Sequence, residues 1–134
     1  MSVRLRVSGL EIRLARRTAP LAGPLDFEMA AGACMALIGE SGSGKSLTAL
    51  ALIGLLPAGL DARGELQFDG HTVALGSPAH HALRGRRLAW MPQDPLASLH
   101  PLRRVGAQLD ESLRALRGLD ADAAAAEARR LFAE

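Results

Sequence analysis

Eight consecutive residues, from Gly39 to Ser46, have the types and the spacing of a phosphate-binding P-loop. The pattern is a glycine, four further residues and then Gly-Lys-Ser. Backbone N–H groups in such a loop curl around phosphate oxygens, and Gly42 and Gly44 carry no Cβ that would block the curl. A helix beginning near Lys45 would point the positive end of its dipole at the same anion. The segment therefore predicts a cradle for the phosphates of a nucleotide.

The side chains of this loop have separate predicted roles. The Lys45 ammonium would reach the β- and γ-phosphates, and the Ser46 hydroxyl would ligate Mg²⁺. Lys45 is the single lysine among 16 lysines and arginines, which favours this interpretation because a compact ammonium fits a phosphate nest that a guanidinium would overfill. The predicted nucleotide-binding residues are Gly39, Glu40, Ser41, Gly42, Ser43, Gly44, Lys45, Ser46 and Leu47.

The segments on either side of the loop predict a strand before it and a helix after it. Residues 34–38 form a continuous apolar run, as expected of a parallel strand covered on both faces, and Cys34 would be a small buried residue in that strand. Residues 46–56 have the composition of a buried helix. The order of strand, glycine loop and helix favours a P-loop over the alternative, a glycine-rich turn that binds no ligand.

Other segments predict an antiparallel part. Residues 3–7 alternate between apolar and charged side chains, and the apolar Leu25, Phe27 and Met29 alternate with acidic residues. Residues 16–24 hold two prolines and a glycine and predict a loop between these strands. Residues 64–70 alternate again and end in Asp-Gly, which predicts a hairpin.

The remaining chain predicts one short strand and two helices. The strand covers residues 88–91, and the helices cover residues 105–116 and 121–133. With the P-loop and the antiparallel strands, this order predicts an α/β fold: a P-loop NTPase core, an antiparallel β-subdomain and the start of a helical subdomain.

Composition excludes several classes of protein. The 134 residues suffice for one domain, and a hydrophobic fraction of 49% argues against disorder. Aromatic residues make up only 3% of the chain and its formal net charge is +2, so we do not expect a nucleic-acid partner. A lone cysteine and an N-terminus without an apolar signal core favour the cytoplasm. The most apolar stretch, residues 47–60, is too short to span a bilayer.

A second polar motif lies in residues 91–101, where Pro92 and Pro95 flank Gln93 and Asp94. The prolines prevent a continuous strand ladder and expose the residues between them. A glutamine amide offers an acceptor for Mg²⁺ and a contact for an attacking water. Taken alone, Gln93 is better interpreted as an ordinary polar residue in a proline-bounded loop.

Together these blocks resemble the ATP-binding subunits of ABC transporters, within them the group that serves oligopeptide, dipeptide and nickel importers. The resemblance covers nearly the whole chain and rests on residues 37–50, 64–70 and 91–101. It implies that residues 91–101 are the Q-loop and that Lys45 and Gln93 are catalytic. It also implies ATP and Mg²⁺ as cofactors, with Ser46 and Gln93 as metal ligands.

The resemblance further implies partners and a location. Such subunits pair with a second ATP-binding subunit, identical or different, and dock onto membrane permease subunits. The chain would then lie in the cytoplasm, peripheral on the inner face of the cell membrane. Solute choice belongs to other polypeptides of such systems.

Several features of the family's pattern are missing from the sequence. It has no Leu-Ser-Gly-Gly-Gln signature, no Walker B strand ending in Asp-Glu and no switch histidine. Asp110-Glu111 lies in a predicted amphipathic helix, whereas a Walker B acid follows a buried strand. No aromatic residue occurs in residues 12–16, where the family stacks adenine, so Leu14 could offer only an apolar contact there.

The histidines raise two further points. His100 occupies a position where this group usually has asparagine. His71, His80 and His81 lie in a polar stretch without accompanying cysteines or a helical i, i+4 pair, so we interpret them as members of a solvated loop rather than as metal ligands.

We therefore expect residues 1–134 to be a partial, N-terminal portion of an ABC ATPase nucleotide-binding domain, with the signature and Walker B acid beyond Glu134. Its function would be to bind and hydrolyse ATP and so energise import of peptides, nickel or a similar small solute. The alternative is a non-catalytic nucleotide-binding or interaction fragment, which the missing acid and signature would explain. A third alternative is a fragment that does not fold stably alone.

Overall fold

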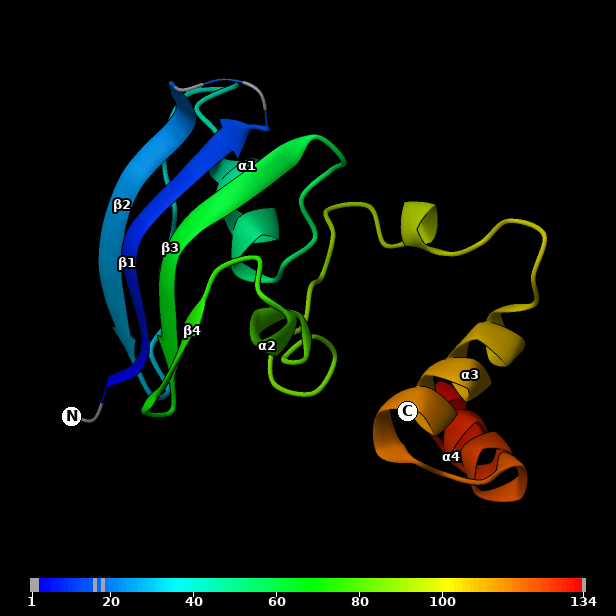
Figure 1. Cartoon of the computed structure of the whole chain (residues 1–134). Coiled ribbons are helices and arrows are strands. Elements are labelled where there is room, and N and C mark those ends of the chain that lie inside the picture. Colours follow the sequence, from blue (N-terminus) through cyan, green and yellow to red (C-terminus); the bar gives the residue numbers. More distant parts are fainter. Residues whose placement is uncertain (1–2, 16, 18, 134) are drawn as a thin grey trace. The chain divides into compact units, whose positions relative to one another are not determined.

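The computed structural model describes residues 3–15, 17 and 19–133, and the chain divides into two compact units, Met1–Ala89 and Trp90–Glu134. The first unit is a twisted antiparallel sheet with helix α1 packed against one face (Figure 1). The second unit is built around two helices that pack on each other. The chain is thus of the α/β class.

The sheet of the first unit has four strands in the order β2-β1-β3-β4, and each neighbouring pair is antiparallel. Their bounds are Val3–Leu14 for β1, Pro20–Ala30 for β2, Leu60–Phe68 for β3 and His71–Ala74 for β4. The predicted strand at residues 3–7 and the predicted 64–70 hairpin are present, and both are longer than expected. Of the predicted loop at residues 16–24, Arg16 and Thr18 lie outside the described residues, and β2 already begins at Pro20.

A bulge in β1 keeps its apolar side chains on one face along the whole strand. Val7 and Leu10 are both buried although three positions separate them, because the pairing with β3 shifts register around Gly9, which has a φ of 59°. Gly64 of β3 lies opposite, and a Cβ there would come within 2.6 Å of the carbonyl oxygens of Ser8 and Gly9. Glycine at position 64 therefore permits this close approach of two backbones.

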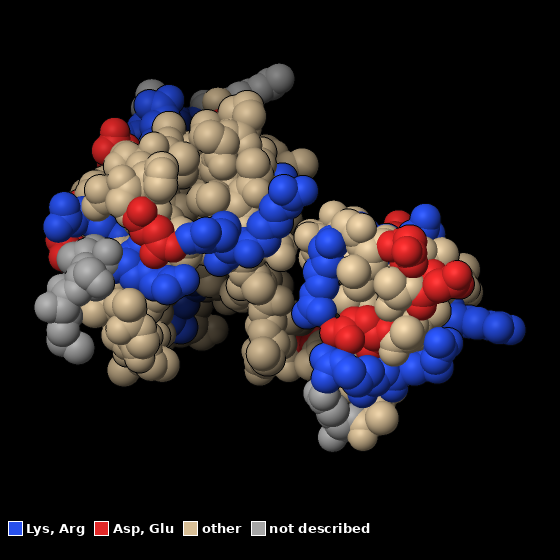
Figure 2. Space-filling model, turned by 90° about the horizontal axis from the view of Figure 1, so that it is seen from below, with Lys and Arg blue, Asp and Glu red and all other residues tan. Residues whose placement is uncertain are grey.

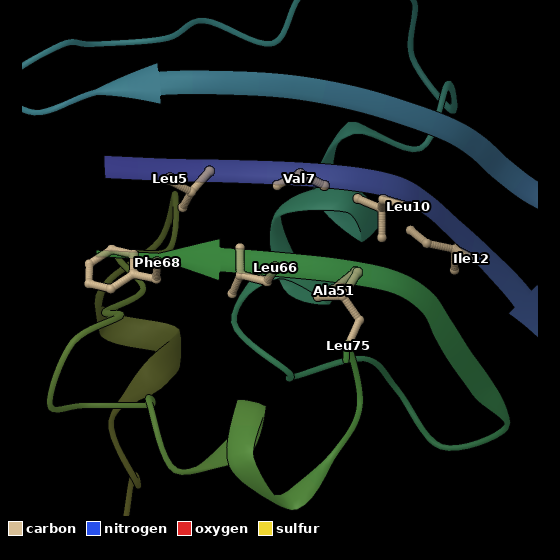
Figure 3. Close-up of a cluster of buried hydrophobic side chains, with 8 residues drawn as sticks. All are labelled: Leu5, Val7, Leu10, Ile12, Ala51, Leu66, Phe68 and Leu75. Atoms are coloured by element: carbon tan, nitrogen blue, oxygen red, sulfur yellow. The ribbon is translucent and has the colours of Figure 1, made fainter. Parts of the chain in front are cut away.

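The core of the first unit lies between the sheet and α1. Its buried side chains come from β1, β3, α1 and the residue after β4, and they point toward one another (Figure 3): Leu5, Val7, Leu10, Ile12, Ala51, Leu66, Phe68 and Leu75. From β2, the predicted apolar row Leu25, Phe27 and Met29 is half-buried against this core, while the acidic residues between them are exposed. The alternation in β2 was therefore predicted correctly.

Helix α1 spans Lys45–Leu52 and is shorter than the predicted helix. It ends because Gly54 adopts the left-handed conformation, with a φ of 70°. The N–H of Leu55 then donates to the carbonyl of Leu50 at 2.8 Å, and the N–H of Gly54 donates to that of Ala51 at 3.1 Å. The turn between β3 and β4 is also determined by its own residues. Asp69 and Gly70 both have positive φ, as a two-residue type I′ hairpin turn requires.

Two predicted strands are absent from the described chain. Residues 34–38 carry no regular structure and are exposed. Cys34, predicted to be a small buried residue, is therefore exposed as well. Residues 88–91 make one isolated bridge, between Arg84 and Leu88. A parallel strand needs a neighbouring strand to pair with along its length and helices to cover its faces, and apart from the Arg84–Leu88 bridge no described segment pairs with either run. The apolar composition was identified correctly, but the buried strands were wrong.

Short helix α2, Pro78–His81, completes the first unit. The second unit holds the 3₁₀ turn η1, Leu96–Ser98, followed by α3, Val105–Arg117, and α4, Ala121–Ala133. Both longer helices were predicted to within one residue. Among the described residues, no helix is both long and apolar enough to cross a membrane.

Charged side chains of both signs lie beside each other on the surface shown in Figure 2. In the second unit Glu127 pairs with Arg117 at 2.8 Å and with Arg130 at 2.9 Å. These arginines hold the pKa of the Glu127 carboxyl near 2, chiefly through the hydrogen bond from Arg130. Because such exposed pairs contribute little to stability, we assign them no role in fixing the fold.

Candidate functional site

The glycines of residues 39–44 give this loop its shape. Gly42 and Gly44 have φ angles of 82° and 90°, a region that other L-residues rarely adopt. A Cβ on Gly44 would lie 3.0 Å from the Cβ of Ala22, and a Cβ on Gly39 would lie 2.8 Å from the Ser43 hydroxyl oxygen. Around Gly42 there is open space, so only its backbone conformation favours glycine there.

The Lys45 ammonium is held over the loop by the loop's own backbone. Its Nζ donates to the carbonyl oxygens of Gly39 at 2.8 Å and Glu40 at 2.6 Å, with the Ser43 hydroxyl 3.4 Å away. A further bond, from the Ser43 N–H to the Glu40 carbonyl at 3.2 Å, closes the turn below it. The loop's own carbonyl groups therefore hold the positive charge against the backbone of residues 39–40.

Helix α1 begins directly at this loop. Gly44 is its N-cap and no side chain caps the helix there, so the N–H groups of the first turn are not occupied by a capping side chain. The first turn carries no acidic residue. The Thr48 N–H and hydroxyl both donate to the Gly44 carbonyl, at 2.8 and 3.0 Å, which ties the loop to a buried side chain of α1. A helix N-terminus of this kind attracts anions.

A hollow of about 260 Å³ lies at this point, lined by Ser41, Gly42, Gly44, Lys45, Ser46 and Leu47. Six of the nine residues predicted to bind nucleotide thus line one hollow, and Gly39, Glu40 and Ser43 surround the Lys45 ammonium beside it. Thr48 was not singled out from the sequence, although a threonine four residues after a glycine at a helix start is a recognisable signal for bonding back to its carbonyl.

Gln93 belongs to the other unit, where it is exposed in a segment without regular structure. Asp94 beside it accepts a hydrogen bond from the Leu96 N–H at 3.1 Å, which begins the 3₁₀ turn η1. Asp110 and Glu111 lie on helix α3, which confirms the predicted helix at these positions. A Walker B acid would instead follow a buried strand. The catalytic and metal-binding roles of Lys45, Gln93 and Ser46 remain predictions.

The prediction of a solvated histidine loop is wrong for His80. Its side chain is fully buried. Its ring also bridges two backbone groups that lie far apart in the sequence. Nδ1 accepts from the Gly76 N–H at 3.0 Å, and Nε2 lies 2.8 Å from the Leu52 carbonyl at the end of α1. Burial lowers the pKa of His80, with smaller contributions from the neighbouring charges of His81 and Arg84, while the bond to Leu52 acts in the opposite direction.

Comparison with known proteins gives a consistent result. The family model for ABC transporters matches residues 22–133. The oligopeptide transport ATP-binding protein OppD of Haemophilus influenzae is 39% identical over 81% of this chain and 34% of its own length. Its Escherichia coli counterpart is 45% identical over 66% of this chain and 27% of its own. The glutathione import ATP-binding protein GsiA of Pectobacterium atrosepticum is 39% identical over 81% of the chain and 19% of its own.

The chain therefore spans about a third or less of the length of these relatives. The matched region nevertheless includes the loop of residues 39–46, helix α1, Gln93 and both helices of the second unit. The chain belongs to the ABC transporter family.

Proposed function

We propose that the chain binds the phosphates of Mg-ATP at residues 39–47 and is the nucleotide-binding part of an ABC-type ATPase. One observation carries the proposal: two left-handed glycines lead into α1, and the carbonyls of Gly39 and Glu40 in the same loop hold the Lys45 ammonium. In architectural terms, the loop and α1 would belong to a P-loop NTPase core, β1–β4 to its antiparallel subdomain, and α3 and α4 to the start of a helical subdomain.

The chemistry of the loop fits a polyphosphate. Backbone N–H groups at an uncapped helix start suit phosphate oxygens, and Lys45 would exchange its two carbonyl acceptors for the more strongly bonding oxygens of a phosphate. A Cβ on Gly39 or Gly44 would press on neighbouring groups, so the small size of the cradle depends on glycine. Mg²⁺, held by Ser46 and Gln93, would supply charge neutralisation at the phosphates.

The names of the relatives support a place for this activity. They are ATP-binding proteins of oligopeptide transport and of glutathione import. We infer by analogy that this chain serves ATP-driven import of a peptide or a similar small solute. It would then act with membrane permease subunits and a second ATP-binding subunit, peripheral on the cytoplasmic face of the membrane.

A calorimetric titration with Mg-ATP tests the proposal. We expect saturable binding that Lys45→Ala weakens by at least tenfold, about 1.4 kcal/mol or more, because a charge-assisted bond to phosphate is lost. Arg86→Ala is a matched control, since Arg86 is an exposed cation outside the loop. Equal affinity of wild type and Lys45→Ala, or no binding by the folded wild type, would refute the proposal.

Binding without hydrolysis is a second candidate function, because the glycine loop, the Lys45 ammonium and the start of α1 are groups that bind phosphate without themselves hydrolysing it. A phosphate-release assay on the same samples separates the two. Release that disappears in Lys45→Ala supports an ATPase, whereas binding with no release supports a nucleotide-binding module.

A further inference from the structure

The structure assigns His100 and Gln108 a positioning role for Gln93. Together they fix residues 100–103, at the end of the segment that starts at Gln93, onto the first turn of α3. This inference rests on the proposed function, because Gln93 is taken to serve the bound Mg-nucleotide. It concerns only contacts within the second unit.

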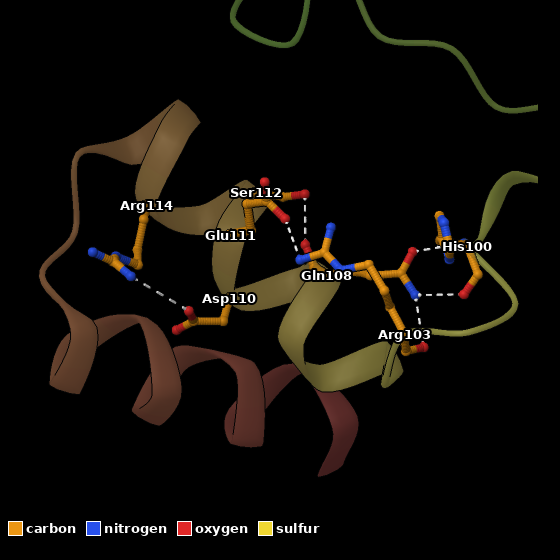
Figure 4. Close-up of polar contacts among 7 residues, drawn as sticks. All are labelled: His100, Arg103, Gln108, Asp110, Glu111, Ser112 and Arg114. Carbon is orange, nitrogen blue, oxygen red and sulfur yellow. Dashed lines mark hydrogen bonds and ion pairs between the residues drawn. The ribbon is translucent and has the colours of Figure 1, made fainter.

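The carboxamide of Gln108 makes three hydrogen bonds to the backbone that precedes its helix (Figure 4). Its Oε1 accepts from the His100 N–H at 2.8 Å, and its Nε2 donates to the carbonyls of His100 at 3.2 Å and Arg103 at 3.1 Å. One side chain thus holds both ends of residues 100–103. Only a carboxamide presents an acceptor and two donors in this way; a carboxylate would keep the acceptor and lose both donors.

His100 closes the same turn from inside. Its Nδ1 accepts from the Leu102 N–H at 3.2 Å, and its carbonyl also accepts from the Arg103 N–H at 3.1 Å. An asparagine bonds the N–H two residues on in the same manner through its side-chain oxygen. The structure thus gives a physical reason why histidine can stand where asparagine is usual in the group that the sequence resembles.

Local hydrogen bonds order residues 94–99, and the contacts with α3 begin at His100. Asp94 accepts from the Leu96 N–H, and the turns of η1 are closed by Ser98 to Pro95 at 3.2 Å and Leu99 to Leu96 at 3.1 Å. The Gln108 clamp follows at the next residue, His100. An ion pair between Arg103 and Glu111 at 2.6 Å adds a contact one turn further along α3. We infer that the hydrogen-bonded turns of residues 94–99 transmit this attachment at His100 to Gln93, which directly precedes them.

The role predicts a specific effect on metal-dependent binding. ATP affinity is measured by titration with Mg²⁺ and again with EDTA, and the ratio gives the gain due to the metal. Gln93→Ala should reduce this gain, and Gln108→Ala should reduce it by about fivefold, because a Gln93 that is no longer held in position would lose about one hydrogen bond's worth of interaction with the Mg-nucleotide. Affinity in EDTA should stay unchanged in both variants.

Conservative variants separate positioning from general structural damage. His100→Asn should keep the wild-type gain, whereas His100→Ala should lower it. Gln108→Glu should lower it because both donors are lost. Ser112→Ala is the matched control on the same helix, because its hydroxyl bonds only the Gln108 carbonyl, at 2.9 Å, and not the clamped turn. In the double variant Gln93→Ala/Gln108→Ala, no loss beyond that of Gln93→Ala is expected.

Three results would overturn the positioning role: an unchanged gain in Gln108→Ala, an equal loss in EDTA, or a full additional loss in the double variant.

Hydrogen exchange at the His100 and Leu102 amides of the nucleotide-free chain keeps this test distinct from that of the proposed function. Slow exchange in wild type that becomes fast in Gln108→Ala supports the clamp even if ATP does not bind. A wild type that binds ATP with no metal-dependent gain refutes the role while leaving phosphate binding intact.

Discussion

The imidazole of His80 joins the end of α1 to the turn after β4, and it can do so only while it is neutral. Nδ1 must be unprotonated to accept from Gly76, and Nε2 then carries the hydrogen that Leu52 accepts. The contact was not predictable from the sequence, since Leu52 and His80 lie 28 residues apart. Nothing in the local pattern of residues 71–81 indicates burial, and the sequence therefore predicts a solvated loop for this histidine.

Stability should therefore depend on pH through His80. Because burial lowers its pKa in the folded chain below the usual 6.5, the unfolded chain takes up a proton first as the pH falls. The free energy of unfolding should change little above pH 6.5 and decrease as the pH falls from 6.5 to the folded pKa. Denaturant titrations of the chain over this range should show a weaker decrease in His80→Gln.

The exposed His71 provides the control, because His71→Gln should keep the wild-type pH dependence. At neutral pH, His80→Ala should also cost about 1–3 kcal/mol, since it removes a fully buried side chain and two hydrogen bonds, to the Gly76 N–H and the Leu52 carbonyl. Identical pH profiles for wild type and His80→Gln would contradict this account.

At the scale of elements, the segments governed by local interactions were predicted well. The α3 and α4 periodicity and the Asp69-Gly70 turn depend on residues close in sequence, so helices and hairpin were confirmed. The predicted parallel strand at residues 34–38 and the predicted short strand at residues 88–91 were wrong, because a strand needs pairing partners that its own residues cannot specify. The P-loop motif also consists of consecutive residues and can therefore be recognised in the sequence. The hydrogen bonds that join Gln108 to His100 and Arg103 can be recognised only in the structure.

The end of α3 provides an element-scale prediction. Gly118 follows the helix with a φ of 67°, and its N–H donates to the Arg114 carbonyl at 3.0 Å. Gly118→Ala should destabilise the α3–α4 unit by about 1 kcal/mol, the cost of a left-handed alanine. Hydrogen exchange of the α3 amides measures this change.

Gly106 is the matched comparison within the same helix. Its φ is not positive and a Cβ would meet nothing within 4 Å, so Gly106→Ala should stabilise α3 by about 0.5–1 kcal/mol. Similar effects of both substitutions would show that the left-handed cap does not limit the stability of this helix.

At the scale of the whole molecule, each unit has its own core. Leu66 is fully buried in the cluster of the first unit, and Leu113 is 5% exposed in the small cluster with Ala124 and Ala128 in the second. The second cluster is much smaller, and a core of that size gives only modest stability. This member of the ABC transporter family therefore contains two units whose hydrophobic cores differ in size.

Core truncations should therefore act locally. Leu66→Ala should cost about 2–5 kcal/mol and speed hydrogen exchange in β1 and β3, while Leu113→Ala should speed exchange in α3 and α4. Residue-resolved exchange of both variants, compared with wild type, tests this. Leu66→Ala accelerating α4 as strongly as β3 would mean that the units are not energetically separate.

The central claim, that residues 39–47 cradle nucleotide phosphates, is tested most directly by the backbone amide resonances of the loop. On titration with Mg-ATP, the NMR shifts of Gly42, Gly44, Lys45 and Ser46 should be among the largest in the chain, because phosphate oxygens accept from these N–H groups. Adenosine, which has no phosphates, should leave them unchanged. Equal shifts with adenosine, or ATP-induced shifts confined to other residues, would contradict the claim.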